Sequence, residues 1–182
     1  MSQGAMEAEQ PAAPTARDGF GRVLMAIAMI GGGVCVAAAL LVTVSVVGRW
    51  LSGLSLGQAL GFGSINGDFE LVKMAVALSV FCFLPLTQWR RGNIMVDTFT
   101  SRLPERVARG IDAFWDFVYA GLAAVLAYTL SDGAREAYRS GKASMVLLLP
   151  EWPVLALCSG LLVVLALTAL ASGLKLLRAL AR

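Results

Sequence analysis

A run of 26 residues without a charged side chain, from Val23 to Gly48, limits the folds open to this chain more strongly than any other part of its sequence. A helix crosses the hydrocarbon core of a bilayer with about 20 apolar residues, whereas the apolar core of a signal peptide is typically about 7–15 residues long. The run is too long for a signal peptide and predicts a retained first transmembrane helix over residues 23–47.

The composition of the whole chain is that of an integral membrane protein. Hydrophobic residues make up 58% and charged residues 15% of the 182 residues, against about 45–50% and about 25% in soluble domains. Further apolar runs predict spans over residues 69–89, 111–131 and 152–174. We therefore expect an all-α integral membrane protein with one four-helix transmembrane domain over residues 20–178. Residues 1–19, rich in Ala, Pro, Glu and Gln, predict a disordered cytoplasmic N-terminus.

A short amphipathic segment is predicted between the second and third spans, over residues 94–103. On a helix, Met95, Phe99 and Leu103 share one face, whereas Asp97 and Ser101 lie on the other. Such a helix is suited to lie in the membrane interface, with its apolar face toward lipid. Asp97 would then point toward water or a partner protein.

Several residues mark where spans begin or end. Arg90 and Arg91 end the second span at the level of the lipid headgroups, and Gly92 allows the chain to turn there. Pro104 suits the first turn of the third helix, where a missing N–H costs no hydrogen bond. Trp152 opens the fourth span and suits the aromatic belt of a membrane protein.

The distribution of basic residues predicts the orientation. Cytoplasmic segments carry an excess of Lys and Arg. One side of the predicted spans holds ten basic residues and the other holds four, with Lys73 inside the second span. Both termini are therefore expected in the cytoplasm. The ten are Arg17, Arg22, Arg90, Arg91, Arg102, Arg106, Arg109, Lys175, Arg178 and Arg182, and the four are Arg49, Arg135, Arg139 and Lys142.

The residue types present argue against catalysis and against transport by this chain alone. There is no histidine, and the three cysteines lie far apart in apolar runs, so no metal site, disulfide framework or nucleophile–base pair is suggested. The net charge is +3, and the basic residues lie at the ends of the spans, so the charge does not indicate nucleic-acid binding. Transporters usually carry polar or ionisable groups near the bilayer midplane, where these spans are nearly all Ala, Val, Leu and Gly. We expect a non-enzymatic auxiliary subunit or scaffold without a cofactor.

The charges near the span ends have two interpretations. They can anchor the helices at the interface, or they can form salt bridges within the chain or to a larger membrane partner. Glu70 and Lys73 are three residues apart in a predicted helix and so are expected to pair. Because buried charge is costly unless paired, Glu70, Lys73 and Asp97 are the strongest candidates for the second interpretation.

Four short motifs in order resemble a known family, the small membrane (DctQ-type) subunit of tripartite ATP-independent periplasmic (TRAP) transporters. They are GRW at 48–50, DFELVK at 68–73, WRRGNIMVDTFTSRLPERV at 89–107 and GKASMVLLLPEWP at 141–153. The last motif is similar to the family's Gly-x-x-Ser followed by Pro-x-Trp, here Ser144, Pro150 and Trp152. The resemblance covers roughly residues 40–170.

The resemblance implies a function that composition does not show. Such subunits sit in the bacterial inner membrane with a large polytopic transport subunit and a periplasmic substrate-binding protein. The complex imports organic anions, commonly carboxylates or sialic acids, on a sodium gradient, and the large subunit holds the sodium ions and the substrate. The small subunit would brace it and help to dock the binding protein. The structural or interface candidates are Arg49, Glu70, Lys73, Arg90, Arg91, Gly92, Asp97, Pro104, Ser144, Pro150 and Trp152.

Two alternatives stay open at this point. One is the small subunit of the related tripartite tricarboxylate transporters, which has a similar size and number of spans. The other is a membrane scaffold or assembly factor unconnected with transport, which predicts no large transport partner and no loss of uptake on deletion.

We predict that Asp97→Ala weakens assembly of the complex or solute uptake, because a lone carboxylate on the polar face of an interfacial helix is suited to bind a partner. Complex yield after affinity purification and uptake into cells are the two measurements. Wild-type values for both would remove the proposed role of Asp97.

Overall fold

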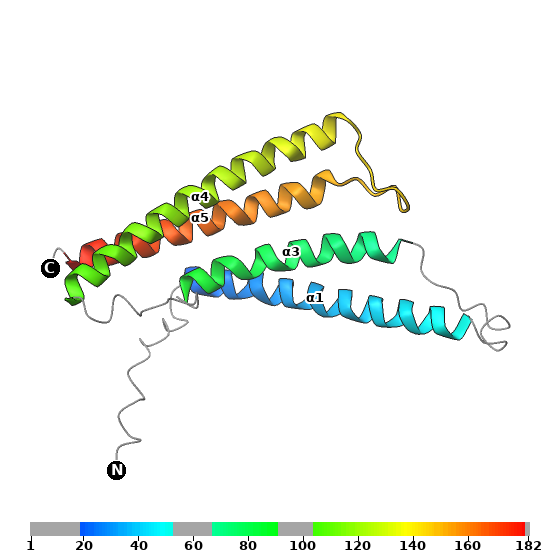
Figure 1. Cartoon of the computed structure of the whole chain (residues 1–182), viewed down its shortest axis with the longest axis horizontal. Coiled ribbons are helices and arrows are strands. Elements are labelled where there is room, and N and C mark those ends of the chain that lie inside the picture. The colour runs from blue at the N-terminus through cyan, green and yellow to red at the C-terminus, as the bar shows by residue number, and fades with distance from the viewer. Residues whose placement is uncertain (1–18, 53–66, 91–103, 181–182) are drawn as a thin grey trace, which may run out of the picture.

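Four long α-helices make up the described part of the chain (Figure 1). The computed structural model describes residues 19–52, 67–90 and 104–180. Each helix is long and apolar enough to cross a membrane, which confirms the predicted all-α class with four transmembrane helices. The predicted interfacial helix over residues 94–103 and residues 1–18 of the N-terminus lie outside the described residues. The helices are α1 (Gly19–Ser52), α3 (Asp68–Trp89), α4 (Glu105–Arg139) and α5 (Trp152–Leu180).

Three of the helices extend beyond the apolar spans expected for them, α1 and α4 at both ends and α5 at its C-terminal end. α1 has 34 residues and α4 has 35, so they are about 51 Å and about 52 Å long, against a hydrocarbon core of about 30 Å. α4 continues to Arg139 because its last turns are amphipathic. Ala134 and Ala137 are buried there, whereas Arg135 pairs with Asp132 at 3.4 Å on the outer side.

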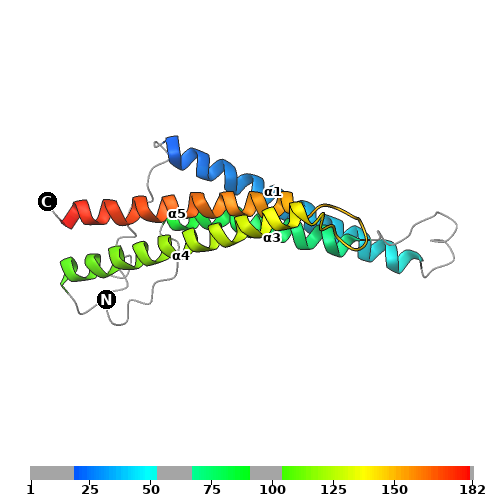
Figure 2. The ribbon, with the colours of Figure 1, turned by 90° about the horizontal axis from the view of Figure 1, so that it is seen from above.

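The helices form two antiparallel hairpins that lie side by side (Figures 1 and 2). α1 packs along α3, α4 packs along α5, and α3 connects the two hairpins through its contacts with α5. We call the end with the first turns of α1 and α4 and the last turns of α3 and α5 the terminal end. The opposite end, where α1 and α4 finish and α3 and α5 begin, is the loop end.

Local sequence sets where α3 and α4 begin. Gly67 has a φ of +90°, in the left-handed region that favours glycine. Its carbonyl oxygen accepts hydrogen bonds from the N–H groups of Glu70 and Leu71 at 3.1 and 3.3 Å. Pro104 stands directly before α4, and its carbonyl oxygen accepts a bond from the N–H of Val107 at 2.9 Å.

A ladder of alanines at a spacing of seven residues joins α4 to α5. Ala113, Ala120, Ala127 and Ala134 are all buried. A period of seven keeps one face of a helix turned toward a neighbour along its length, and small side chains let two backbones approach closely in a membrane. The ladder was not identified in the sequence, although its spacing is visible there.

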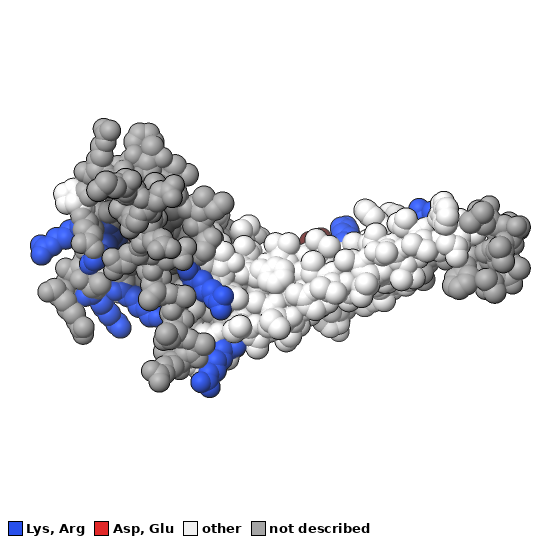
Figure 3. All heavy atoms as spheres, turned by 90° about the horizontal axis from the view of Figure 1, so that it is seen from below, with Lys and Arg blue, Asp and Glu red and all other residues white. Residues whose placement is uncertain are grey.

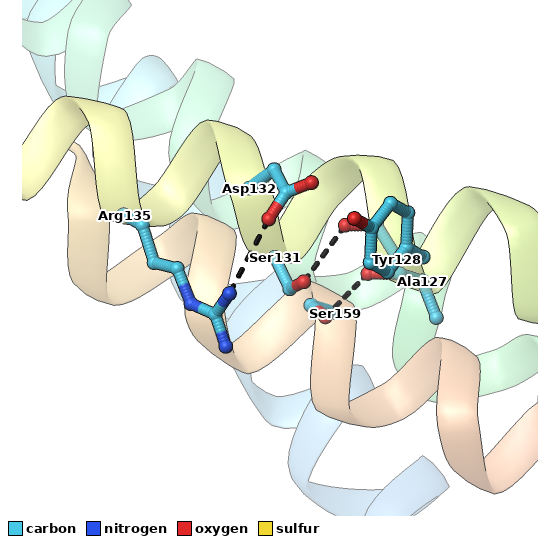
Figure 4. Close-up of polar contacts among 6 residues, drawn as sticks. All are labelled: Ala127, Tyr128, Ser131, Asp132, Arg135 and Ser159. Atoms are coloured by element: carbon cyan, nitrogen blue, oxygen red, sulfur yellow. Dashed lines mark hydrogen bonds and ion pairs between the residues drawn. The ribbon is translucent and has the colours of Figure 1, made fainter.

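A hydrogen bond joins the two helices nearer the loop end than the terminal end. The hydroxyl of Ser159 on α5 donates to the carbonyl oxygen of Ala127 on α4 at 2.9 Å (Figure 4). Ser159 is buried, so the bond satisfies a hydroxyl that lipid could not. The alanine ladder makes the bond possible, because a larger residue at this level would separate the two backbones.

α1 and α3 also meet at a small residue. A Cβ atom placed on Gly31 would lie 2.5 Å from the Cβ atom of Cys82 and 3.4 Å from the carbonyl oxygen of Ser79. Cys82 and Ser79 are both buried. The two helices therefore approach closely at Gly31, and a larger side chain there would force them apart.

We predict that Gly31→Ala destabilises the protein by about 1–3 kcal/mol, the usual cost of overpacking a close contact. Gly33→Ala is the matched control, because a Cβ there would meet nothing within 4 Å and alanine favours a helix. Thermal unfolding in detergent measures both variants. Equal midpoints for the two would contradict the close contact.

Candidate functional site

Basic side chains gather at the terminal end of the bundle, and the part of the same face beside them is mostly uncharged (Figure 3). They come from the first turns of α1 and α4 and from the last turns of α3 and α5. The described residues of this group are Arg22, Arg90, Arg106, Arg109, Lys175 and Arg178. Arg91, Gly92 and Asp97, which the sequence placed next to this end, lie outside the described residues.

Contacts of the last turn of α3 join the helices at the terminal end. The ring of Trp89 meets the ring of Phe20 edge to face, with centroids 5.2 Å apart, and the Nζ atom of Lys175 lies 3.8 Å from a Trp89 ring centroid. The side-chain amide of Gln88 donates to Asp116 Oδ1 at 2.9 Å. These contacts tie α3 to α1, α5 and α4 respectively.

At the loop end, one carboxylate of α3 holds a loop that lies more than seventy residues away in the sequence. Glu70 accepts hydrogen bonds from the hydroxyl of Ser144 and from the N–H groups of Val146 and Leu147, the last two at 3.0 Å. Ser144 is buried. With three donors on its two oxygens, this carboxylate acts as a structural anchor for the loop between α4 and α5.

Internal hydrogen bonds shape this loop, residues 141–151, which we call the apolar loop. The N–H of Ser144 donates to the carbonyl oxygen of Leu149 at 2.9 Å, and Lys142 pairs with Glu151 at 3.7 Å across the base. Ala143 and Pro150 form an isolated antiparallel bridge. The tip is apolar and exposed, and consists of Met145, which is 94% exposed, Val146 and Leu148.

The structure therefore joins Glu70 to Ser144, which the sequence had placed in separate motifs, and Pro150 lies in the same loop as Ser144. The spacing of Glu70 and Lys73 had predicted an ion pair between them, and the structure does not show this pair. Within the described residues, Glu70 bonds to the apolar loop, and no ion pair joins it to Lys73. The reason is tertiary, because the loop brings several donors to a carboxylate that local geometry would have assigned to its neighbour.

Two other predicted residues lie at the loop end of the bundle. Arg49 Nη2 is 3.9 Å from Asp68 Oδ2, and Asp68 also accepts a bond from the buried hydroxyl of Ser45 on α1. This contact ties the end of α1 to the start of α3. Trp152, the first residue of α5, packs edge to face on Tyr138 of α4, with ring centroids 5.3 Å apart.

A groove of about 670 Å³ lies below the apolar loop, between α3 and the α4–α5 hairpin. We call it the α3–α5 groove. Charged residues line it near the loop, and its deeper part is apolar. The deeper residues are Met74, Ala77, Phe81, Leu130, Val154, Leu155 and Cys158.

The polar side chains described above bond to other parts of the same chain. In the described ranges, no group of three His, Cys, Asp or Glu residues is placed to hold a metal ion. The carboxylates of Asp68, Glu70 and Asp116 accept bonds from groups that hold helix ends or a loop. The molecule is a multi-pass helical membrane protein whose polar contacts organise its own two ends.

Comparison with known families completes the assignment. Residues 38–182 match the family model of the DctQ component of tripartite ATP-independent periplasmic transporters. Because the match covers most of the chain, the chain belongs to this family, as its motifs indicated, and is a small membrane subunit of a TRAP transporter. Such subunits work with a large transport subunit and a binding protein. This decides against the tricarboxylate alternative. No curated protein and no solved structure matched the sequence.

We predict that Glu70 and Ser144 are energetically coupled and that Glu70 and Lys73 are not. In double-mutant cycles with Glu70→Gln, Ser144→Ala should give a coupling of at least about 0.5 kcal/mol, whereas Lys73→Gln should be additive within about 0.5 kcal/mol. Unfolding in detergent provides the free energies. The reverse pattern would restore the pair expected from sequence spacing.

Proposed function

We propose that this subunit braces the large subunit of a sodium-driven importer of organic anions, carboxylates or sialic acids, in the bacterial inner membrane. In this proposal it also helps to receive the periplasmic binding protein. Both termini face the cytoplasm, and the chain itself is not catalytic. Substrate and sodium ions bind in the large subunit.

The family match carries the proposal, and the distribution of buried surface supports it. Of the most apolar 18-residue window of each helix, only 17–39% is buried within the chain. The remaining apolar surface is available to lipid or to a partner helix. A transport pathway needs polar groups at membrane depth, and the windows that cross the membrane carry at most two charged residues each.

The two ends of the bundle support the proposed orientation. The terminal end carries six of the described basic residues, as cytoplasmic ends of membrane proteins generally do. The loop end would then face the periplasm, and the apolar loop, held in shape by Glu70, would be on the side from which a binding protein approaches.

Mild-detergent purification of the tagged chain from its native membrane tests this proposal. We expect a much larger polytopic protein to co-purify in stoichiometric amount. A folded, abundant chain that purifies alone would overturn the proposal and favour a scaffold without a transport partner.

Reconstitution of the purified complex tests the sodium and substrate parts. With the binding protein present, we expect a sodium gradient to drive uptake of a labelled dicarboxylate or sialic acid into proteoliposomes. A potassium gradient of the same size is the control. Equal uptake with the two gradients would contradict sodium coupling.

A further inference from the structure

The α3–α5 groove combines a charged rim with an apolar interior. Lys73 lies at the groove five residues after the start of α3, and Met74, Ala77 and Phe81 follow it along the same side. At 1.5 Å per residue, Phe81 is about 12 Å deeper along the helix than Lys73. The groove therefore runs from near the loop end toward the middle of the membrane.

Lys73 is a cation at the rim of the groove, and the carboxylates that line the groove bond to other groups. Among the described residues it forms no ion pair, and its side chain is exposed. Of the acidic residues that line the groove, Glu70 accepts three bonds from the apolar loop, and Asp68 is bonded by Ser45 and lies near Arg49. The third is Glu151, which pairs with Lys142.

A cation near the edge of the hydrocarbon core can reach the lipid headgroups, where an anionic group stabilises it. Two lysines line the groove. Lys142 pairs with Glu151, whereas Lys73 has no carboxylate partner among the described residues. An anionic group of a bound molecule would complete this site. Because the groove beyond Lys73 is lined by apolar residues, that molecule should carry an apolar chain next to its charged group.

We propose that the α3–α5 groove binds a glycerophospholipid, with its phosphate at Lys73 and one acyl chain along Met74, Ala77 and Phe81. The depth of about 12 Å fits one leaflet, which is about 15 Å of the hydrocarbon core. The volume of about 670 Å³ lies in the usual range of ligand pockets, about 300–1,000 Å³. Three carboxylates and two lysines line the groove, and the excess of one negative charge suits the ammonium group of a zwitterionic headgroup.

The lining of the groove favours a lipid over a helix of a partner protein. A glycerophospholipid carries a phosphate next to an acyl chain, as the cation at the rim and the apolar lining beyond it require. An acyl chain is much thinner and can bend to follow the lining. The proposal is independent of the transport function, since it concerns only residues of this chain.

Native mass spectrometry of the purified full-length chain tests the proposal. The probes are phosphatidylethanolamine and diacylglycerol with the same acyl chains, added after delipidation. We expect one phosphatidylethanolamine to bind wild type about tenfold more tightly than diacylglycerol, the effect of one charge-assisted hydrogen bond. Lys73→Gln should remove this difference while leaving the fold intact, because the side chain is exposed. Arg139→Gln, a change of an exposed cation outside the groove, is the matched control.

A second pair of variants tests the acyl-chain site. Ala77→Trp should fill the groove and prevent binding of both probes, whereas Val76→Trp, at an exposed neighbour outside the lining, should bind them as wild type does. Circular dichroism confirms that each variant is helical.

Two results would overturn the proposal. One is equal binding of the two probes to wild type. The other is unchanged lipid binding by Ala77→Trp. If this variant binds lipid as wild type does but loses the large subunit, the groove binds the partner protein instead. If wild type retains its lipid but no large subunit co-purifies, the proposed function fails while the lipid site stands.

Discussion

Close approach of helix backbones underlies the whole architecture of this subunit. In a membrane, apolar side chains gain little by leaving lipid for one another, so helices associate where small residues let them pack tightly. The alanine ladder of α4, exemplified by Ala120 and Ala127, and Gly31 on α1 provide such contacts. The two hairpins follow from them, and α3 joins the hairpins because it also packs on α5.

Polar contacts then organise the ends of the bundle in different ways. At the terminal end, Trp89 packs against Phe20 and Lys175, so aromatic and cationic groups join three helices near the interface. At the loop end, the carboxylate of Glu70 satisfies backbone N–H groups of an exposed loop. A loop held by its backbone can present an apolar tip without depending on the side chains of that tip. This suits a surface that another molecule contacts.

The limited burial of the helices connects the fold to the function. A bundle that buries at most 39% of its most apolar windows leaves most of each span for lipid or for a larger neighbour. A subunit that braces a transporter, as proposed above, would need such surface and would not need polar groups at the midplane. The α3–α5 groove differs from the rest of this apolar surface. Lys73 at its rim can bind an anionic group, which a lipid acyl chain does not supply.

Local patterns in the sequence were enough to establish the class of this protein, its four spans and its family. Span lengths, charge at span ends and short motifs are properties of neighbouring residues, and so Pro104 and Trp152 could be assigned to helix starts from the sequence. The seven-residue spacing of Ala113, Ala120, Ala127 and Ala134 is equally regular and could have predicted the α4 ladder.

The partner of Glu70, in contrast, depends on tertiary packing. Its spacing from Lys73 favoured an ion pair, but the competing donors at Ser144, Val146 and Leu147 reach Glu70 only after α4 and α5 have packed and α3 has docked against them. A contact made across such a distance in sequence depends on the packing of whole helices, which no local pattern records.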